Sequence, residues 1–500
     1  MKIERLEKRV YEIIPGALVW LTVAMSVVLS YFQPLWMVYF VIVYDLYWLF
    51  RVAYFLPFLL SSWWTYKRDI KIDWLSLAKT QPGFNDIYHV VVMPTVKEEL
   101  FVLMDSVESL LNSAYPKDRM IVVIGGEERA RELFEPKARA IKEKYGDKFY
   151  LLTTTLHPGD IPGEIRGKGS NVHWMGERVL EKINELGIPI DNVLVHSFDI
   201  DTVAHPQYFA CVTYKFLTVE KPHHASYQPV VLYNNNMWES PAAVRVAMFG
   251  TTFWLMTELP RAEGMMTFAS HSMTLRMLVD VGFWQANMVS EDSRIFLQAL
   301  VRYSGDYRVV PIHLPVSMDT VMSGNYWHAL KALYKQMQRW AYGVENFPYM
   351  AMNFSRDPKM PLWTKIKFIW KQLEGMYIWA TVPLLIFLLG NLPFWLAPER
   401  FRSYAVFQNT PFTLEWLMRF AMVGAFVSAL MALTLLPPRP KYIPRWQTPI
   451  VMVFQWILLP VTFVLFGAVP AIDSQTRLML GKYLGFYVSP KRGGGEEKNA

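Results

Sequence analysis

Long apolar stretches stand at both ends of this chain and enclose a charged middle part. A helix needs roughly 20 apolar residues to cross the hydrocarbon core of a bilayer. Five stretches meet that length, at about residues 14–32, 35–60, 376–396, 414–436 and 449–468. The chain is therefore predicted to fold as a membrane protein with one water-facing domain inserted between its spans.

The composition agrees with a membrane protein. Hydrophobic residues make up 53% of the chain and charged residues 19%, below the roughly 25% charge usual in soluble proteins. The formal net charge of +7 comes largely from Lys and Arg beside the apolar stretches, where cytoplasmic loops carry such residues. No basic groove with interleaved aromatics is evident, so no nucleic-acid partner is expected. The lone Cys211 cannot form an internal disulfide.

These patterns predict how the chain is divided. Pro460 lies within the last apolar stretch and Pro470 just after it, which is compatible with a broken or a re-entrant span. The sequence leaves open on which side of the membrane the tail lies. The segment "WTKIKFIWKQL" predicts a basic amphipathic helix on an anionic membrane surface, or alternatively a core-facing helix. The expected parts are a transmembrane hairpin at 1–66, a water-facing domain at 67–355, an amphipathic interface helix at 356–374, transmembrane segments at 375–471 and a tail at 472–500.

The middle domain reads as an α/β fold. The apolar runs "YHVVVMP", "RMIVVIGG" and "NVLVHSF" are separated by helical patterns, and this alternation predicts βαβ units with a mostly parallel sheet. Ligands of such sheets bind at the carboxyl ends of the strands. The basic linker "PPRPKYIPRWQ" between the last two spans is expected in the cytoplasm. We therefore expect an integral protein of the plasma (inner) membrane with a cytoplasmic middle domain.

Two acidic motifs follow apolar runs. Asp199 and Asp201 in "SFDIDT" come directly after a predicted strand, where two carboxylates could hold one divalent cation; a capped turn is the alternative. Glu291 and Asp292 in "MVSEDSRIF" open an amphipathic helix. Acids are favoured there by the helix dipole, but a carboxylate at such a position could also serve as a general base.

Two basic motifs complete the set. Lys168 lies in the Gly-rich "IRGKGSNVHW", a predicted loop in which it could meet a phosphate or simply face solvent. In "YKQMQRWAYG", Gln336, Arg339 and Trp340 share one helical face at i, i+3 and i+4. This run reads as a membrane anchor or as the rim of a site, since Arg can bind a diphosphate and Trp offers a flat surface for a sugar ring.

Together these motifs predict one reaction. A metal holds a diphosphate, basic residues neutralise it, a carboxylate activates a hydroxyl, and an aromatic ring holds the acceptor. Transfer of a sugar from a nucleotide sugar needs these parts, with charge stabilised electrostatically on the leaving group. A single base without a second carboxylate nucleophile favours inversion at the anomeric carbon.

The motifs resemble those of family 2 glycosyltransferases, in particular the membrane-embedded synthases of the cellulose, hyaluronan and chitin type. "MPTVKEE", "GKGSN", the D-x-D pair, "SED" and "QMQRW" occur in the family's order over the whole middle domain. The resemblance implies a GT-A-like fold with a Mn or Mg ion at Asp199 and Asp201. It implies a nucleotide-sugar donor, with a UDP-sugar favoured, and a polysaccharide or lipid-linked acceptor beside membrane lipids.

The resemblance also implies roles for individual residues. Asp292 would be the base with Glu291 as its neighbour, and Arg339 would face the diphosphate. Gln336 and Trp340 would border the acceptor. The implied donor-site residues are Thr95, Glu98 and Lys168.

Two places depart from the family pattern. Where the family carries Asp-Asp-Gly after its second strand, this chain has "IGGEE", so that Glu127 or Glu128 stands in the place of the acid that contacts the nucleobase. The segment "TFASHSMT" corresponds to the acceptor loop and places His271 there. This segment departs from the loop of cellulose synthases.

Three functions remain open from the sequence. The first is a processive hexosyltransferase that extends a polysaccharide and exports it through its own spans, where Asp45 and Arg51 could line a tunnel. The second is a non-processive enzyme that adds one sugar to a membrane lipid. The third, of a different class, is a non-catalytic transporter or receptor with a nucleotide-binding domain.

Overall fold

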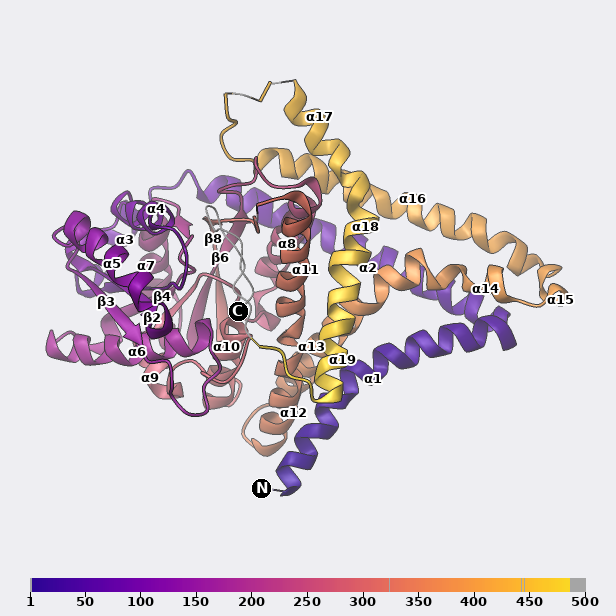
Figure 1. Ribbon diagram of the computed structural model, residues 1–500, viewed down its shortest axis with the longest axis horizontal. Helices are drawn as coiled ribbons and strands as arrows, with labels where there is room; N and C mark the ends of the chain where they lie inside the picture. The colour runs from indigo at the N-terminus through magenta and orange to yellow at the C-terminus, as the bar shows by residue number, and fades with distance from the viewer. Residues whose placement is uncertain (1, 323, 442, 445, 486–500) are drawn as a thin grey trace.

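The computed structural model describes residues 2–485 except 323, 442 and 445, so the part of the predicted tail at 486–500 lies outside the described residues. An α/β domain occupies one side of the molecule and long apolar helices extend from the other (Figure 1). Helices α8 and α11 lie between these two parts in the view of Figure 1.

The α/β domain is built on one sheet of eight strands in the order β3-β2-β1-β4-β7-β6-β8-β5. Its strands are β1 (Tyr88–Pro94), β2 (Met120–Glu127), β3 (Leu151–His157), β4 (Val193–Ser197), β5 (Val203–Ala204), β6 (Ala225–Tyr233), β7 (His271–Thr274) and β8 (Arg308–Met318). The pairs among β1 to β4 are parallel, as the sequence predicts.

Beyond β4 the sheet is mixed. β7 runs antiparallel to both β4 and β6, and His271 at its start pairs with Ser197 at the carboxyl end of β4. The chain between β6 and β7 contains α8 (Ala242–Glu258) and η6 (Leu259–Gly264), and β7 then enters the sheet between β4 and β6. The prediction of a mostly parallel sheet therefore holds for β1 to β4 and for the pair of β6 with β8, whereas β7 and the short β5 are antiparallel additions.

Helices cover both faces of the sheet. α5 and α6 both pack on β2 and β3, and α7 and α8 pack farther along the sheet. The helices of this domain are α3 (Trp74–Lys79), α4 (Leu100–Leu111), α5 (Arg131–Tyr145), α6 (Lys168–Glu185), α7 (Tyr208–Thr218), α8 (Ala242–Glu258), α9 (Leu275–Val281), α10 (Glu291–Arg302), α11 (Tyr326–Ala341) and α12 (Asn346–Arg356). Short one-turn helices η6 (Leu259–Gly264) and η7 (Tyr342–Glu345) join them.

A buried hydrogen-bonded chain ties three central strands together. His89 on β1 lies 2.7 Å from His196 on β4, whose other ring nitrogen lies 2.7 Å from the hydroxyl of Ser272 on β7. That hydroxyl lies 2.7 Å from the hydroxyl of Tyr208 on α7. Burial lowers the pKa of His89 to about 3 and also lowers the pKa of His196, so both rings stay neutral in the core.

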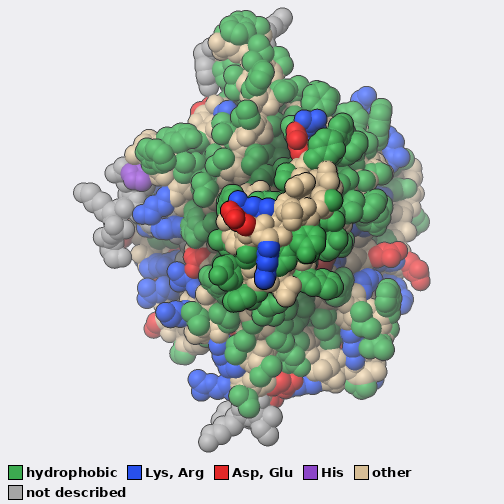
Figure 2. Space-filling model, turned by 90° about the vertical axis from the view of Figure 1, so that its right-hand side faces the viewer, with side chains coloured by type: hydrophobic (Ala, Val, Ile, Leu, Met, Phe, Trp, Pro, Cys, Tyr) green, Lys and Arg blue, Asp and Glu red, His purple; other side chains and the backbone are tan. Residues whose placement is uncertain are grey.

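Four helices are long and apolar enough to cross a membrane, and a bent pair makes a fifth candidate, in agreement with the five stretches in the sequence. The helices outside the α/β domain are α1 (Lys2–Phe32), α2 (Pro34–Asp69), α13 (Leu362–Phe387), α14 (Leu392–Leu396), α15 (Glu399–Arg402), α16 (Ala405–Thr434), α17 (Gln447–Phe454), α18 (Leu459–Phe463) and α19 (Val469–Leu480). The face of the molecule at the right of Figure 1 carries mainly hydrophobic side chains (Figure 2).

The predicted interface helix at 356–374 is not a separate element. α12 ends at Arg356, and α13 then runs without a break from Leu362 to Phe387, so its basic amphipathic half continues directly into an apolar span. Trp363 and Trp370 on that half are 73% and 66% exposed, which suits rings that rest at a membrane interface.

The last apolar segment, from α17 to α19, begins and ends at the α/β domain. Just before it, the Pro438 carbonyl accepts a hydrogen bond of 3.1 Å from the indole of Trp238. Just after it, Leu484 packs against Val289 and Tyr342. Because both ends lie against the same domain, we infer that this segment returns to the side from which it starts. Pro470 is the second residue of its final helix.

Arg51 and Asp45 of α2 differ in their surroundings. Arg51 forms an ion pair with Glu374 of α13 and also donates to the Tyr47 hydroxyl at 2.8 Å. Asp45 is 8% exposed among packed helices. Arg51 is thus paired with a carboxylate of a neighbouring helix.

The arrangement predicts which residues lie on opposite sides of the membrane. Single cysteines at Glu399→Cys, in α15, and Lys482→Cys, after α19, should react with a membrane-impermeant thiol reagent from opposite sides of sealed vesicles. Labelling from the same side would contradict the returning segment. The unaltered chain is the control and should stay unlabelled, because its one thiol, Cys211, is 1% exposed.

Candidate active site

One lysine lies at the centre of the carboxyl edge of the sheet. The Nζ atom of Lys168 is 2.7 Å from Oδ1 of Asp199 and 2.9 Å from Oδ1 of Asp292. It is also 3.0 Å from Oδ2 of Asp292 and 3.7 Å from Oε1 of Glu291. The structure thus brings four sequence-predicted residues from three distant segments into direct contact.

Local backbone geometry allows this contact. Lys168 is the first residue of α6 and not part of a loop, which corrects the prediction made from its glycine-rich surroundings. A Cβ atom on Gly169 would lie 3.1 Å from the Gln285 carbonyl oxygen and 3.4 Å from Cβ of Glu291. The glycine therefore lets the first turns of α6 and α10 approach each other closely.

Burial and charge compete in this cluster. Burial disfavours the ammonium of Lys168, but the carboxylates of Asp199, Asp292 and Glu291 outweigh it and raise its pKa. Burial, with the adjacent Asp292 carboxylate, raises the pKa of Glu291 to about 7. Lys168 therefore stays a cation, whereas the pKa of Glu291 is raised because burial and the adjacent Asp292 carboxylate disfavour its charged form.

The two acids of the D-x-D motif, Asp199 and Asp201, differ in their exposure and in their contacts. Asp201 is 2% exposed, and its Oδ2 accepts a hydrogen bond of 2.7 Å from the backbone N–H of Asp319. The side chain of Asp199 is 24% exposed and faces Lys168. Among residues 2–485 as described, no group of three or more His, Cys, Asp or Glu could hold a metal by itself, so an ion here would need further ligands from the substrate and water.

The helix α11 brings the "QMQRW" residues to the same edge. The ring of Trp340 lies 5.7 Å from that of Tyr233 and 5.9 Å from that of Phe268. Gln336 is 4% exposed, and the Arg339 guanidinium acts on the pKa of Glu291. Of these three residues of α11, Arg339 is the one with a direct electrostatic effect on the acidic cluster.

A second set of contacts joins α10 to the chain that follows α11. Glu345 accepts hydrogen bonds from the backbone N–H groups of Val289 and Ser290, at 3.1 and 3.0 Å, and from the Ser290 hydroxyl at 2.8 Å. Arg294, on α10, donates to the Asn346 side chain at 2.8 Å and to the Glu345 carbonyl at 3.1 Å. Glu345 and Arg294 therefore position the turn that carries Glu291 and Asp292.

The structure places His271 inside the sheet and not in an open loop. Its side chain is 0% exposed, with Nδ1 2.8 Å from the Phe268 carbonyl and 3.8 Å from Oδ1 of Asp292. Burial lowers the pKa of His271 to about 4. It is a neutral neighbour of Asp292, and its predicted contact with an acceptor stays a prediction.

The donor-site residues predicted near β1 and β2 form a separate group. Glu98 accepts hydrogen bonds from the Thr95 hydroxyl at 2.8 Å and from the backbone N–H of Val96 at 2.7 Å, which fixes the loop after β1. Glu127 at the end of β2 is 2% exposed and lies 3.5 Å from the ring of His157. Of the two acids in "IGGEE", Glu127 is thus the buried one.

The sequence analysis missed three residues of this region: Tyr233, Arg294 and Glu345. Tyr233 ends a strand, and the rule that sites form at the carboxyl ends of strands could have found it. Glu345 and Arg294 carry no local signal, because their roles depend on contacts more than 50 residues away along the chain.

The comparisons with known proteins identify the class. The sequence model described as "Glycosyl transferase family group 2" matches residues 194–469, more than half of the chain. The chain belongs to this family and is a glycosyltransferase. This assignment sets aside the non-catalytic transporter or receptor. The matched range contains Asp199, Asp201, Asp292 and Trp340, whereas Lys168 lies before it.

Solved structures of glycosyltransferases give weak matches. The mannosyltransferase PcManGT of Pyrobaculum calidifontis, in complex with GDP-Man and Mn2+, is 14% identical with a TM-score of 0.38, covering 83% of this chain and 97% of that one. TarS 1-349 of S. aureus, in complex with UDP-GlcNAc, is 13% identical with a TM-score of 0.31, covering 71% and 95%. The search of curated proteins gives no match.

Glu345→Ala should loosen the start of α10. It leaves three donors without their acceptor, and one unsatisfied buried donor costs about 1–3 kcal/mol. We expect a lower thermal midpoint and a reduced kcat. Glu345→Gln keeps one acceptor oxygen and should fall between wild type and Glu345→Ala, and Ser290→Ala should cost less because it removes only one of the three bonds. Unchanged stability and kcat in Glu345→Ala would show that the hydrogen bonds accepted by Glu345 do not position the start of α10.

Proposed function

We propose that this glycosyltransferase is inverting and metal-dependent and takes its sugar from a nucleotide diphosphate. The observation that carries the proposal is the contact of one ammonium, Lys168, with the metal-ligand candidate Asp199 and the base candidate Asp292. The same ammonium thus holds both acids at one place on the carboxyl edge of the sheet.

Asp292 is the proposed base. Its carboxylate removes the proton from an acceptor hydroxyl while that oxygen attacks the anomeric carbon. The bond between this carbon and the diphosphate oxygen breaks, and its electron pair leaves with the diphosphate. Both oxygens of Asp292 lie within 3.0 Å of the Lys168 ammonium, so we propose that the arriving diphosphate draws Lys168 away and frees Asp292.

The proposed metal requirement rests on the ligand atoms that the chain offers to a metal ion. Asp199 and Asp201 offer hard carboxylate oxygens, and Mn or Mg is commonly bound by one or two carboxylates together with substrate phosphates. A bound ion would neutralise charge on the diphosphate. Asp319 holds the Asp201 carboxylate through its backbone N–H, and Arg339 is the further cation proposed to face the leaving group.

The nucleotide is proposed to be UDP, with its base near Thr95, Glu98 and Glu127. One oxygen of Glu127 is buried with no hydrogen-bond partner in the part of the chain that the structure describes. A carboxylate oxygen placed in this way can accept a hydrogen bond from an N–H group of a nucleobase. Glu127 is therefore the proposed acid for base recognition, in preference to Glu128.

The acceptor is proposed to reach the site from the membrane side. Trp340 and Gln336 lie on α11, which packs against α19, and His271 remains a candidate contact. A growing polysaccharide exported through the spans is the first candidate. The second candidate is a lipid acceptor that receives one sugar. In either case we propose an inner-membrane location with residues 67–355 in the cytoplasm.

Asp292→Asn tests the chemistry. Membranes with the full-length protein, Mn or Mg and a panel of nucleotide sugars should release nucleoside diphosphate from at least one donor. The variant should lower kcat by roughly 10²–10⁴-fold, the usual effect of a positioned base. Asp306→Asn, whose carboxylate pairs with Lys221 at 2.8 Å away from the site, should retain activity. A fully active Asp292→Asn enzyme would overturn the assignment of the base.

The size of the product separates the two acceptors. With the active donor in excess, a lipid acceptor predicts a labelled product that extracts into organic solvent and carries one added sugar. A polysaccharide acceptor predicts long chains even at low enzyme concentration. Removal of divalent metal by a chelator should stop both reactions, and activity that persists without metal would refute the metal proposal.

A further inference from the structure

Tyr233 has a buried hydroxyl that the fold does not use. It is the last residue of β6 and is 3% exposed. Its hydroxyl oxygen has no hydrogen-bond partner among the residues that the structure describes. Buried polar groups are nearly always paired, and an unpaired one costs stability, so an unpaired hydroxyl at a site calls for a ligand as its partner.

The position of Tyr233 is at the candidate active site. Its ring lies 5.7 Å from that of Trp340. The carboxylates of Asp199, Asp201 and Asp292 and the guanidinium of Arg339 are all close enough to act on the pKa of its hydroxyl. Tyr233 therefore lies near both the proposed metal ligands and the proposed diphosphate-binding cation.

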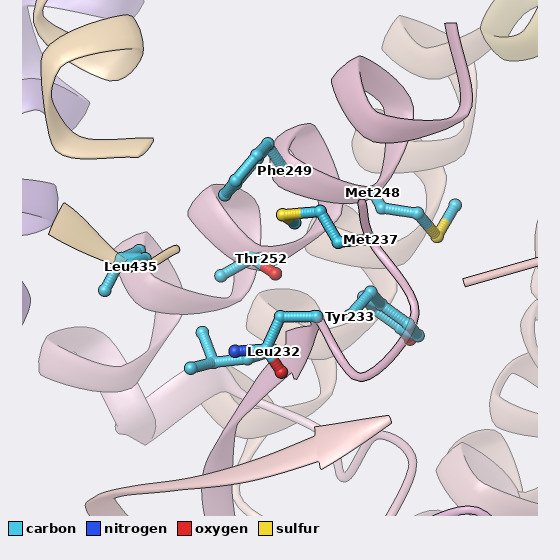
Figure 3. A pocket seen from close by; sticks show the side chains of 8 residues that line it. Leu232, Tyr233, Met237, Met248, Phe249, Thr252 and Leu435 are labelled. Carbon is cyan, nitrogen blue, oxygen red and sulfur yellow. The ribbon is translucent and has the colours of Figure 1, made fainter. Parts of the chain in front are cut away.

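The neighbouring residues of β6 point in different directions. Figure 3 shows Leu232 directed toward Leu435, next to the end of α16, and the side chain of Tyr233 directed away from it. This alternation is that of a strand, in which successive side chains face opposite sides. Leu232 thus points toward the end of α16, while the Tyr233 ring points away from it and lies beside Trp340.

The Tyr233 hydroxyl can act only as a neutral group. Burial raises its pKa far above the usual range, and the nearby acids add to the effect. The O–H group therefore stays protonated and has a hydrogen to donate. The partner that it lacks is an acceptor, and a phosphate oxygen is a strong acceptor that forms short, charge-assisted hydrogen bonds.

We propose that the Tyr233 hydroxyl donates a hydrogen bond to the diphosphate of the bound nucleotide sugar. The inference rests on the proposed donor chemistry and adds a residue to it. Arg339 and Lys168, the cations proposed for the same diphosphate, supply charge, whereas Tyr233 supplies a neutral directed donor. Because negative charge grows on the diphosphate as the sugar leaves, this bond strengthens during the reaction.

Tyr233→Phe tests the proposal with the ring retained. Binding of UDP, of GDP and of inorganic pyrophosphate is measured by calorimetry on the purified full-length protein with Mn. The variant should bind the nucleoside diphosphate that binds wild type about tenfold to a hundredfold more weakly, the loss typical of one hydrogen bond to a charged group. Its thermal midpoint without ligand should equal or exceed that of wild type, because the change removes an unpaired buried hydroxyl.

Tyr227→Phe is the matched control on the same strand. The Tyr227 hydroxyl donates to the Pro222 carbonyl at 3.3 Å, so this variant should lose stability and keep its affinity for diphosphate. Unchanged affinity in Tyr233→Phe would overturn the proposal, as would a raised KM for the acceptor alone. Failure of wild type to bind any of the three probes would instead refute the donor chemistry on which the proposal rests.

Discussion

The ammonium of Lys168 among three carboxylates is the interaction on which this site depends. Asp199 follows β4, Glu291 and Asp292 open α10, and Lys168 opens α6. Without the cation, three acids would face one another in a poorly solvated space and repel. In other proteins, removal of one partner from a buried ion pair costs about 3–5 kcal/mol. The lysine thus stabilises the approach of three segments whose carboxylates would otherwise repel one another.

Two sets of hydrogen bonds connect this cluster to α11 and to the last helix. Glu345 and Arg294 fasten the start of α10 to the chain after α11. α11 is in turn fastened to the last helix, where the Ser474 hydroxyl donates to the Gln338 carbonyl at 2.7 Å and Asp473 accepts from the Gln338 amide. The proposed base is therefore connected through α11 to the membrane-associated end of the chain by hydrogen bonds.

The sequence predicted those parts of the fold and the site that short segments encode. Strands β1, β2 and β4 are visible as apolar runs, and the D-x-D and "SED" motifs lie within six residues each. The antiparallel β7 was missed because "HSMT" is half polar, and its place depends on a pairing with Ser197, 74 residues away by number. The continuity of α13 was also missed, since an amphipathic pattern followed by an apolar one looks like two elements although nothing in the backbone separates them. Lys168 was assigned to a loop because two glycines flank it, whereas Gly169 lets two helices approach.

The returning segment from α17 to α19 has a consequence for the biosynthesis of the protein. Ser474, Asp473 and Leu484 lie at the very end of the described chain, yet they contact Gln338 and Val289 in the middle of the catalytic domain. A ribosome finishes the α/β domain well before these residues emerge. The hydrogen bonds between α11 and α19 therefore form only when translation is nearly complete. Until then, α11 of the nascent chain lacks these contacts.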